Sequence, residues 1–182
     1  MTPSPLRTHA AALLLVALAG CGVTSVETPD PAAIPDGPLE AHGAPATGPV
    51  VELGSDVSAG LGWRYAIYPS DDGWCTQLEM GSAAAAGCGD ILPIGDEAFG
   101  SVGQGNAMAD GVTPIEGIVT AETVTVWLLA DDGRRMPVTL MSLEPAGLEG
   151  QAFLALVPAD TTITHLLALA ISGEVLETYE LP

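Results

Sequence analysis

The sequence contains no lysine and only four arginines, against 23 aspartate and glutamate residues. All of the acidic residues follow Cys21, and the formal net charge at pH 7 is −19. Such a chain repels nucleic-acid phosphates and anionic lipid headgroups. The composition therefore excludes binding to either of them through a basic patch, and we expect no nucleic-acid partner.

Aromatic residues are also scarce, whereas residues that favour turns are plentiful. Only 8 of the 182 residues are Phe, Trp or Tyr, while 37 are Gly or Pro. This balance favours many short elements joined by turns over long helices. Apolar residues nevertheless make up 48% of the chain. That share is enough for a packed core, and the length suits one globular domain.

The apolar run near the N-terminus is too short to cross a bilayer. It comprises Ala10–Ala19, ten residues, whereas a membrane-spanning helix needs about 20. Arg7 and the amino terminus place positive charge before this run. The arrangement predicts a helical secretory signal peptide over residues 1–20.

The four residues at the end of this segment form a recognisable processing motif. Leu18-Ala19-Gly20-Cys21 resembles the lipobox of bacterial lipoproteins, and the resemblance covers residues 1–21 alone. It implies that the Cys21 sulfur receives a diacylglyceryl group and that cleavage precedes Cys21. A thiolate is the nucleophile that a thioether requires, and two acyl chains anchor a protein stably. We therefore expect an exported protein held by its lipid at the cytoplasmic or outer membrane. The alternative is an ordinary secreted protein with a cysteine at its cleavage site.

The next segment, residues 21–49, has the composition of a tether. From Gly22 to Pro49 it contains six Pro and four Gly, with no aromatic residue and no Lys or Arg. Its apolar residues follow neither a helical nor an alternating period, so it lacks a face that could pack. We expect a disordered linker here, with His42 as a bystander, and a globular domain over residues 50–182.

Three segments of this domain have the pattern of β-hairpins. In each, two β-rich runs flank a turn, at Asp71-Asp72-Gly73, Asp131-Asp132-Gly133 and Ser172-Gly173. Such turns need residues that tolerate positive φ, which makes Asp-Gly a strong hairpin signal. Further strand candidates are residues 99–103, 115–120 and 151–157. The pattern predicts an all-β domain, an antiparallel β-sandwich or barrel-like fold of about eight or nine short strands.

A two-residue turn in each hairpin also predicts which residues lie opposite each other. On this construction one strand of the second hairpin is apolar on both faces, so we expect it to be central or covered on both sides. The expected pairs are Tyr65–Met80, Ile67–Leu78, Trp127–Val138, Leu129–Met136 and His165–Glu180.

The only cysteines of the domain, Cys75 and Cys88, are predicted to form a disulfide. An even pair of cysteines in an exported protein is normally oxidised. Zinc is the rival interpretation, but it needs about four ligands, and the one histidine after residue 50 is the distant His165. We therefore expect no metal at this pair, and no metal site or cofactor elsewhere in the protein.

The remaining motifs give no catalytic constellation. The acidic turns could bind calcium, but they lack the spacing of an EF-hand loop, and turn formation explains them without a metal. Gly103-Gln104-Gly105 lacks the third glycine of a dinucleotide-binding loop. Trp74, directly after a tight turn, is a candidate for recognition of a sugar or partner, with core packing as the alternative. We therefore expect a non-catalytic interaction or binding module. The alternatives are an envelope hydrolase that uses carboxylates, and an acidic calcium-binding or structural envelope protein.

Overall fold

The computed structural model describes residues 33–58, 60–93, 96–106 and 111–182. The predicted signal peptide and Cys21 lie outside these ranges. Within them, regular structure consists of β-strands and one short 3-10 helix, η1 (Glu144–Ala146). No helix in the described ranges has the length and apolar character needed to cross a membrane.

Twelve strands are present in the described part of the chain, which confirms the all-β prediction but exceeds the expected number. They are β1 (Val51–Ser58), β2 (Leu61–Ser70), β3 (Gly73–Met80), β4 (Ala83–Gly89), β5 (Phe99–Gln104), β6 (Val112–Val119), β7 (Thr125–Ala130), β8 (Arg135–Val138), β9 (Leu140–Ser142), β10 (Gln151–Pro158), β11 (Ile163–Leu169) and β12 (Val175–Glu180). The sequence pattern missed β1 and β4 because Gly, Ser, Asp and Ala have low β propensity. It also merged β8 and β9, which pair with strands of two different sheets.

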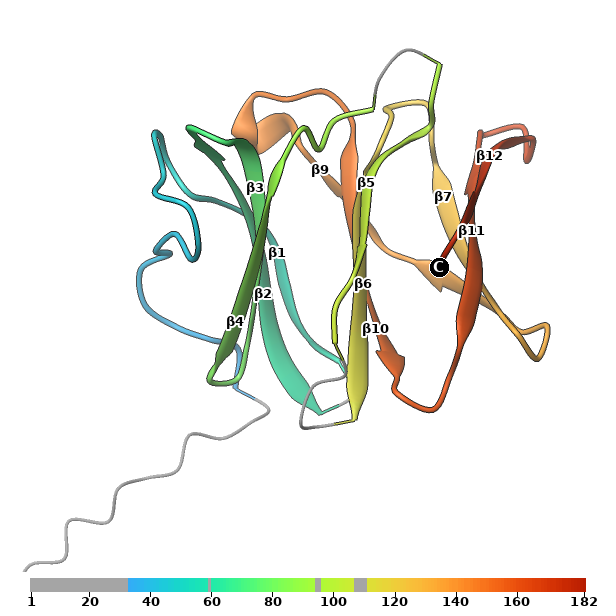
Figure 1. Cartoon of the computed structure of the whole chain (residues 1–182), viewed down its shortest axis with the longest axis horizontal. Helices are drawn as coiled ribbons and strands as arrows, with labels where there is room; N and C mark the ends of the chain where they lie inside the picture. Colours follow the sequence, from blue (N-terminus) through green and yellow to red (C-terminus); the bar gives the residue numbers. More distant parts are fainter. Residues whose placement is uncertain (1–32, 59, 94–95, 107–110) are drawn as a thin grey trace, which may run out of the picture.

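The strands form three antiparallel sheets of four strands each, stacked as three layers (Figure 1). The first sheet has the order β1-β2-β3-β4, and the middle sheet has the order β5-β6-β10-β9. The third sheet has the order β12-β11-β7-β8. The short link at Thr139 carries the chain from the third sheet to the middle one. The fold is therefore sandwich-like, with one layer more than a two-sheet sandwich.

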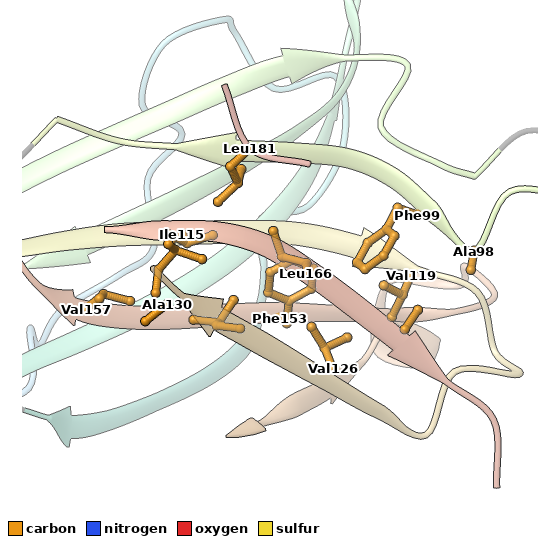
Figure 2. Packing of buried hydrophobic residues seen from close by; sticks show 13 residues of the cluster. Ala98, Phe99, Ile115, Val119, Val126, Ala130, Phe153, Val157, Leu166 and Leu181 are labelled. Carbon is orange, nitrogen blue, oxygen red and sulfur yellow. The ribbon is translucent and has the colours of Figure 1, made fainter. Parts of the chain in front are cut away.

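The middle sheet is buried on both faces, because the first and third sheets pack on either side of it. Neighbouring side chains along each of its strands point to opposite sides and so enter different core clusters. On β10, Leu154 belongs to the core cluster shared with the first sheet, while Phe153 belongs to the cluster shared with the third. Figure 2 shows the cluster between the middle and third sheets, in which Phe153 packs edge-on against Phe99 with ring centroids 6.3 Å apart. Gly117 leaves room for this ring, since a Cβ at that position would lie 2.7 Å from it.

In the first two hairpins the residues that lie opposite each other differ from the pairs that we expected. In the first, Ser70 pairs with Gly73, so Tyr65 lies opposite Leu78 rather than Met80, and Ile67 lies opposite Thr76 rather than Leu78. This shift of two residues leaves Tyr65 and Ile67 on the buried face.

In the second hairpin the loop has three residues, since Ala130 N donates to Arg134 O. The resulting shift of one residue places Val126 opposite Val138 and Leu128 opposite Met136. The predicted pairs Trp127–Val138 and Leu129–Met136 are therefore wrong. Because a shift of one residue exchanges the two faces of a strand, Val126 and Leu128 enter the core. Trp127 and Leu129 are half-buried on the opposite face.

The third hairpin confirms the predicted pairing of His165 with Glu180. Its loop also has three residues, because Ala170 N donates to Glu174 O. A β-bulge between Ala168 and Leu169 compensates for the extra loop residue, so the pairing beyond the bulge is the one expected for a two-residue turn.

Residues 33–49, which we call the N-terminal strap, are docked on the first sheet and are not the free coil that their composition predicts. Thr47 N donates to Pro69 O at 2.8 Å, and Ala46 forms an isolated β-bridge with Ser70. Gly62 allows close approach at the other end, since a Cβ there would lie 2.1 Å from Ala33 O. The packed domain therefore includes the strap and does not begin at Val50.

The strap covers a buried polar network on the outer face of the first sheet. Arg64 Nε donates to Glu79 Oε2 at 2.9 Å, and Arg64 Nη1 donates to Gly37 O of the strap at 2.9 Å. Gln77 accepts a hydrogen bond from His42 N, and the His42 ring lies 3.2 Å from Glu79 Oε1. His42 is thus part of this network rather than a bystander. Buried charged groups require such partners, which explains why the strap stays bound without an apolar face.

Candidate functional site

The strongest candidate site is a pocket of about 170 Å³ between the first and middle sheets. Its inner wall carries Tyr65 of β2, Thr76 of β3 and Glu116 of β6. Its rim includes Gly87 and Cys88 of the edge strand β4, both of which are exposed. The pocket therefore connects buried polar side chains with the protein surface.

Glu116 reaches this pocket because of the alternation along β6. Ile115 on one side of it belongs to the core shared with the third sheet, so Glu116 points toward the first sheet. Its Oε2 atom is buried and has no hydrogen-bond partner among the described residues. Burial raises the pKa of the Glu116 carboxyl above its usual value, while the nearby hydroxyls of Tyr65 and Thr76 partly offset that rise.

Tyr65 is the second unpartnered group. The whole residue is 0% exposed, and its hydroxyl has no hydrogen-bond partner in the described ranges. Burial raises the pKa of this hydroxyl well above its usual range, the charge of Glu116 and the interaction of the two side chains raise it further, and Thr76 lowers it in part. The phenol therefore stays protonated and can donate a hydrogen bond or accept one.

These unpartnered groups are costly to the fold. A buried polar atom without a hydrogen bond costs about 1–3 kcal/mol, and more if it is charged. Tyr65 and Glu116 are near enough to shift each other's pKa, but neither Tyr65 Oη nor Glu116 Oε2 makes a hydrogen bond of standard geometry among the described residues. Most buried polar groups in native proteins are satisfied, so two such atoms in a single pocket need an explanation. A carboxyl group with a perturbed pKa in a cleft is typical of a functional site.

The predicted disulfide is confirmed, and it joins β3 to β4, the strand that carries the rim of this pocket. Cys75 and Cys88 occupy directly paired positions on β3 and β4 and are bonded. The bond fixes β4, whose small side chains contribute little packing, against its neighbour. On the opposite wall, Ser101 N donates to Ile91 O at 2.9 Å, which holds the chain before β5 over the pocket.

Comparison with known proteins gives no match. No protein-family model fits the chain, and neither a curated protein nor a solved structure is significantly similar to it. The function must therefore be argued from the site itself.

Trp74 does not contribute to this pocket. It is half-buried and packs against the core cluster between the first and middle sheets. This packing is what the core-packing alternative predicts.

The acidic turns serve as turns. Asp132 Oδ1 accepts a hydrogen bond from Arg134 N, and its Oδ2 accepts one from Arg134 Nε. These hydrogen bonds, that from Arg134 N foremost, lower the pKa of Asp132. Within the described ranges, no group of three or more His, Cys, Asp or Glu side chains is arranged to hold a metal ion.

His165 lies beside Glu180 along the strand, but its ring is engaged elsewhere. Its Nδ1 atom lies 2.9 Å from Thr164 Oγ1. No ion pair joins it to Glu180 in the part of the chain that the structure describes.

A second concavity, of about 330 Å³, lies where the three sheets meet. Its lining is mixed, with Trp63, Met136 and Met141 among the apolar residues and Asp56 and Ser58 among the polar ones. No buried polar atom lining this groove is without a hydrogen bond among the described residues. The Glu116 pocket therefore gives the stronger argument for a ligand.

Sequence reasoning missed Glu116 and Tyr65 as site residues. The available signal was the β6 segment, Val112–Val119, in which Glu116 is the one charged residue among apolar neighbours. A strand buried on both faces reads as an apolar run, so a single carboxyl within it is conspicuous. That signal has meaning only once the strand is known to be central.

Proposed function

We propose that this chain is a lipid-anchored, exported binding protein of the cell envelope. The lipobox residues that end at Cys21 support the anchor, because their position after a short apolar run suits lipoprotein processing. The Cys75–Cys88 disulfide agrees with export, since such bonds persist in oxidising compartments. The domain then meets its ligand outside the cytoplasmic membrane.

The observation that carries the binding function is the pair of unpartnered polar atoms, Tyr65 Oη and Glu116 Oε2, in one surface-connected pocket. A ligand that hydrogen-bonds to both would remove their desolvation cost. Hydrolysis of glycosides, the enzymatic alternative, requires two carboxyl groups. Glu116 is the single carboxyl among the described residues that line the pocket. Binding is therefore the better-supported function.

The docked strap limits how far the domain can lie from its anchor. Eleven residues, 22–32, separate Cys21 from the strap, which begins at Ala33. Even a fully extended chain of this length spans only about 40 Å. We expect the domain to remain close to the membrane surface that holds the lipid.

Metabolic labelling with a fatty-acid probe tests the anchor. We expect wild-type protein to carry the label and to remain in the membrane fraction. Cys21→Ser should lose both, because an oxygen at this position cannot form the thioether. Equal labelling of the variant would contradict the lipoprotein proposal and leave a secreted binding protein.

A further inference from the structure

We propose that the Glu116 pocket binds a small organic cation, such as an ammonium group or a guanidinium group, through the Glu116 carboxylate. This inference rests on the proposed binding function and specifies its ligand. The ligand can be a small free molecule or the cationic end of a larger one, since the exposed rim at Gly87 and Cys88 lets the remainder project outward.

The polar groups of the pocket match the donors of such a cation. Glu116 Oε2 is an acceptor without a partner, and the Tyr65 hydroxyl, also without a partner, can accept as well as donate. The Thr76 side chain, which interacts with both Tyr65 and Glu116, adds a further oxygen, and Ser101 also lines the pocket. An ammonium group presents several N–H donors and no acceptor, so it can satisfy several of these oxygens at once.

The charge of the pocket favours the same ligand. Two of the arginines in the described ranges form ion pairs away from the pocket, Arg64 with Glu79 and Arg134 with Asp132. The third, Arg135, lies on β8 of the third sheet. None of them lines the pocket. A buried carboxylate without a partner is strongly unfavourable, and a bound cation would neutralise it. The net charge of −19 also attracts cations to the surface and repels anions.

The chemistry of the lining distinguishes an organic cation from a metal ion. Calcium takes six to eight oxygen ligands, usually including several carboxylates. The described lining offers a single carboxyl, and no metal-binding cluster occurs in the described ranges. An ammonium or guanidinium group needs only one anionic partner, with neutral hydroxyls for its other donors.

The size of the pocket limits the part of the ligand that it can enclose. A volume of about 170 Å³ corresponds to roughly five or six water molecules at about 30 Å³ each. Ethanolamine is within this range and carries both an ammonium group and a hydroxyl. Ethylene glycol is its neutral counterpart of nearly the same size.

The test compares these two probes on the full-length protein in detergent, by calorimetric titration. We expect saturable binding of one ethanolamine molecule per chain and no binding of ethylene glycol. Glu116→Gln, which keeps the shape of the side chain, should weaken ethanolamine binding about tenfold or more. Tyr65→Phe should weaken it several-fold. Glu149→Gln, at an exposed position, removes the same charge and should leave binding unchanged.

Each contrary outcome has a separate meaning. Equal losses in Glu116→Gln and Glu149→Gln would overturn the inference, because the attraction would then be diffuse. Equal binding of ethanolamine and ethylene glycol, with both lost in Tyr65→Phe, would refute the cationic ligand but retain the pocket as a binding site. Absence of binding by wild-type protein would overturn both the ligand and the pocket, while the fatty-acid label would still decide the anchor. Near-ultraviolet circular dichroism checks that each variant is folded.

Discussion

Removal of the Cys75–Cys88 disulfide should destabilise the protein and loosen the rim of the candidate pocket. The perturbation is the double variant Cys75→Ala/Cys88→Ala, compared with the oxidised wild type. The bond joins β3 to the edge strand β4, whose residues are alanine and glycine apart from Cys88. Because these side chains are small and mostly exposed, little apolar packing holds β4 once the bond is lost.

The magnitude follows from the loop that the bond closes. The two cysteines are 13 residues apart, so the loop contains about 14 residues. In the chain-entropy account, closing such a loop stabilises the fold by about 3 kcal/mol at 25 °C. For a domain of about 150 residues, this loss lowers the melting temperature by roughly 6–12 °C. The effect is a large share of the 5–15 kcal/mol that typically separates folded from unfolded domains.

Urea denaturation with and without a thiol reductant measures this difference. The reductant should lower the unfolding midpoint of wild-type protein to about that of the double variant, and it should leave the variant unchanged. Hydrogen exchange should accelerate in β4 and at its partner positions on β3. Equal midpoints for oxidised and reduced wild type would refute the reasoning. Two alkylatable thiols in protein taken from the cell envelope would refute the bond itself.

Three further predictions concern other parts of the molecule. The free energy of unfolding of Glu116→Gln should rise relative to that of wild type as pH rises from the ordinary carboxyl pKa of 4.5 through the higher folded pKa, because burial disfavours the carboxylate in the wild type. Urea midpoints of the two proteins that stay parallel across this pH range would contradict it. Phe153→Ala, which leaves a cavity between the middle and third sheets, should cost about 3–5 kcal/mol in urea denaturation, and a loss below 1 kcal/mol would count against the core assignment. Gly62→Ala should displace the strap, because the added Cβ would lie 2.1 Å from Ala33 O. Limited proteolysis should then cleave within residues 33–49, and unchanged protection would show that the strap is not held there.

Local sequence patterns were sufficient for several features of this protein. Alternating apolar residues around two Asp-Gly turns and one Ser-Gly turn identified the all-β class and three hairpins, because both signals depend on residues close in the chain. The Cys75–Cys88 bond was predicted for a similar reason, since the domain has only two cysteines and they are near each other. The pairing of His165 with Glu180 was also correct, although a bulge that the pattern could not reveal was needed to restore it.

The tertiary structure decided which face of each strand is buried and which polar groups are left unpaired. A change of one residue in loop length put Met136 and Val138 on the face of Val126 and Leu128, which is the core face, and not on that of Trp127 and Leu129. Alternation along the strands does not encode the length of the loop. The docking of residues 33–49 depends on Arg64 and Gln77, which are distant in sequence and meet the strap only after the first sheet has formed. Glu116 became a candidate ligand-binding residue only when the first sheet covered the face of β6 on which it lies. Whether a carboxyl is solvated, paired or isolated depends on surroundings that are distant in the sequence and meet only on folding. The sequence by itself therefore determined most of the strands, and the stacking of the sheets created the candidate site.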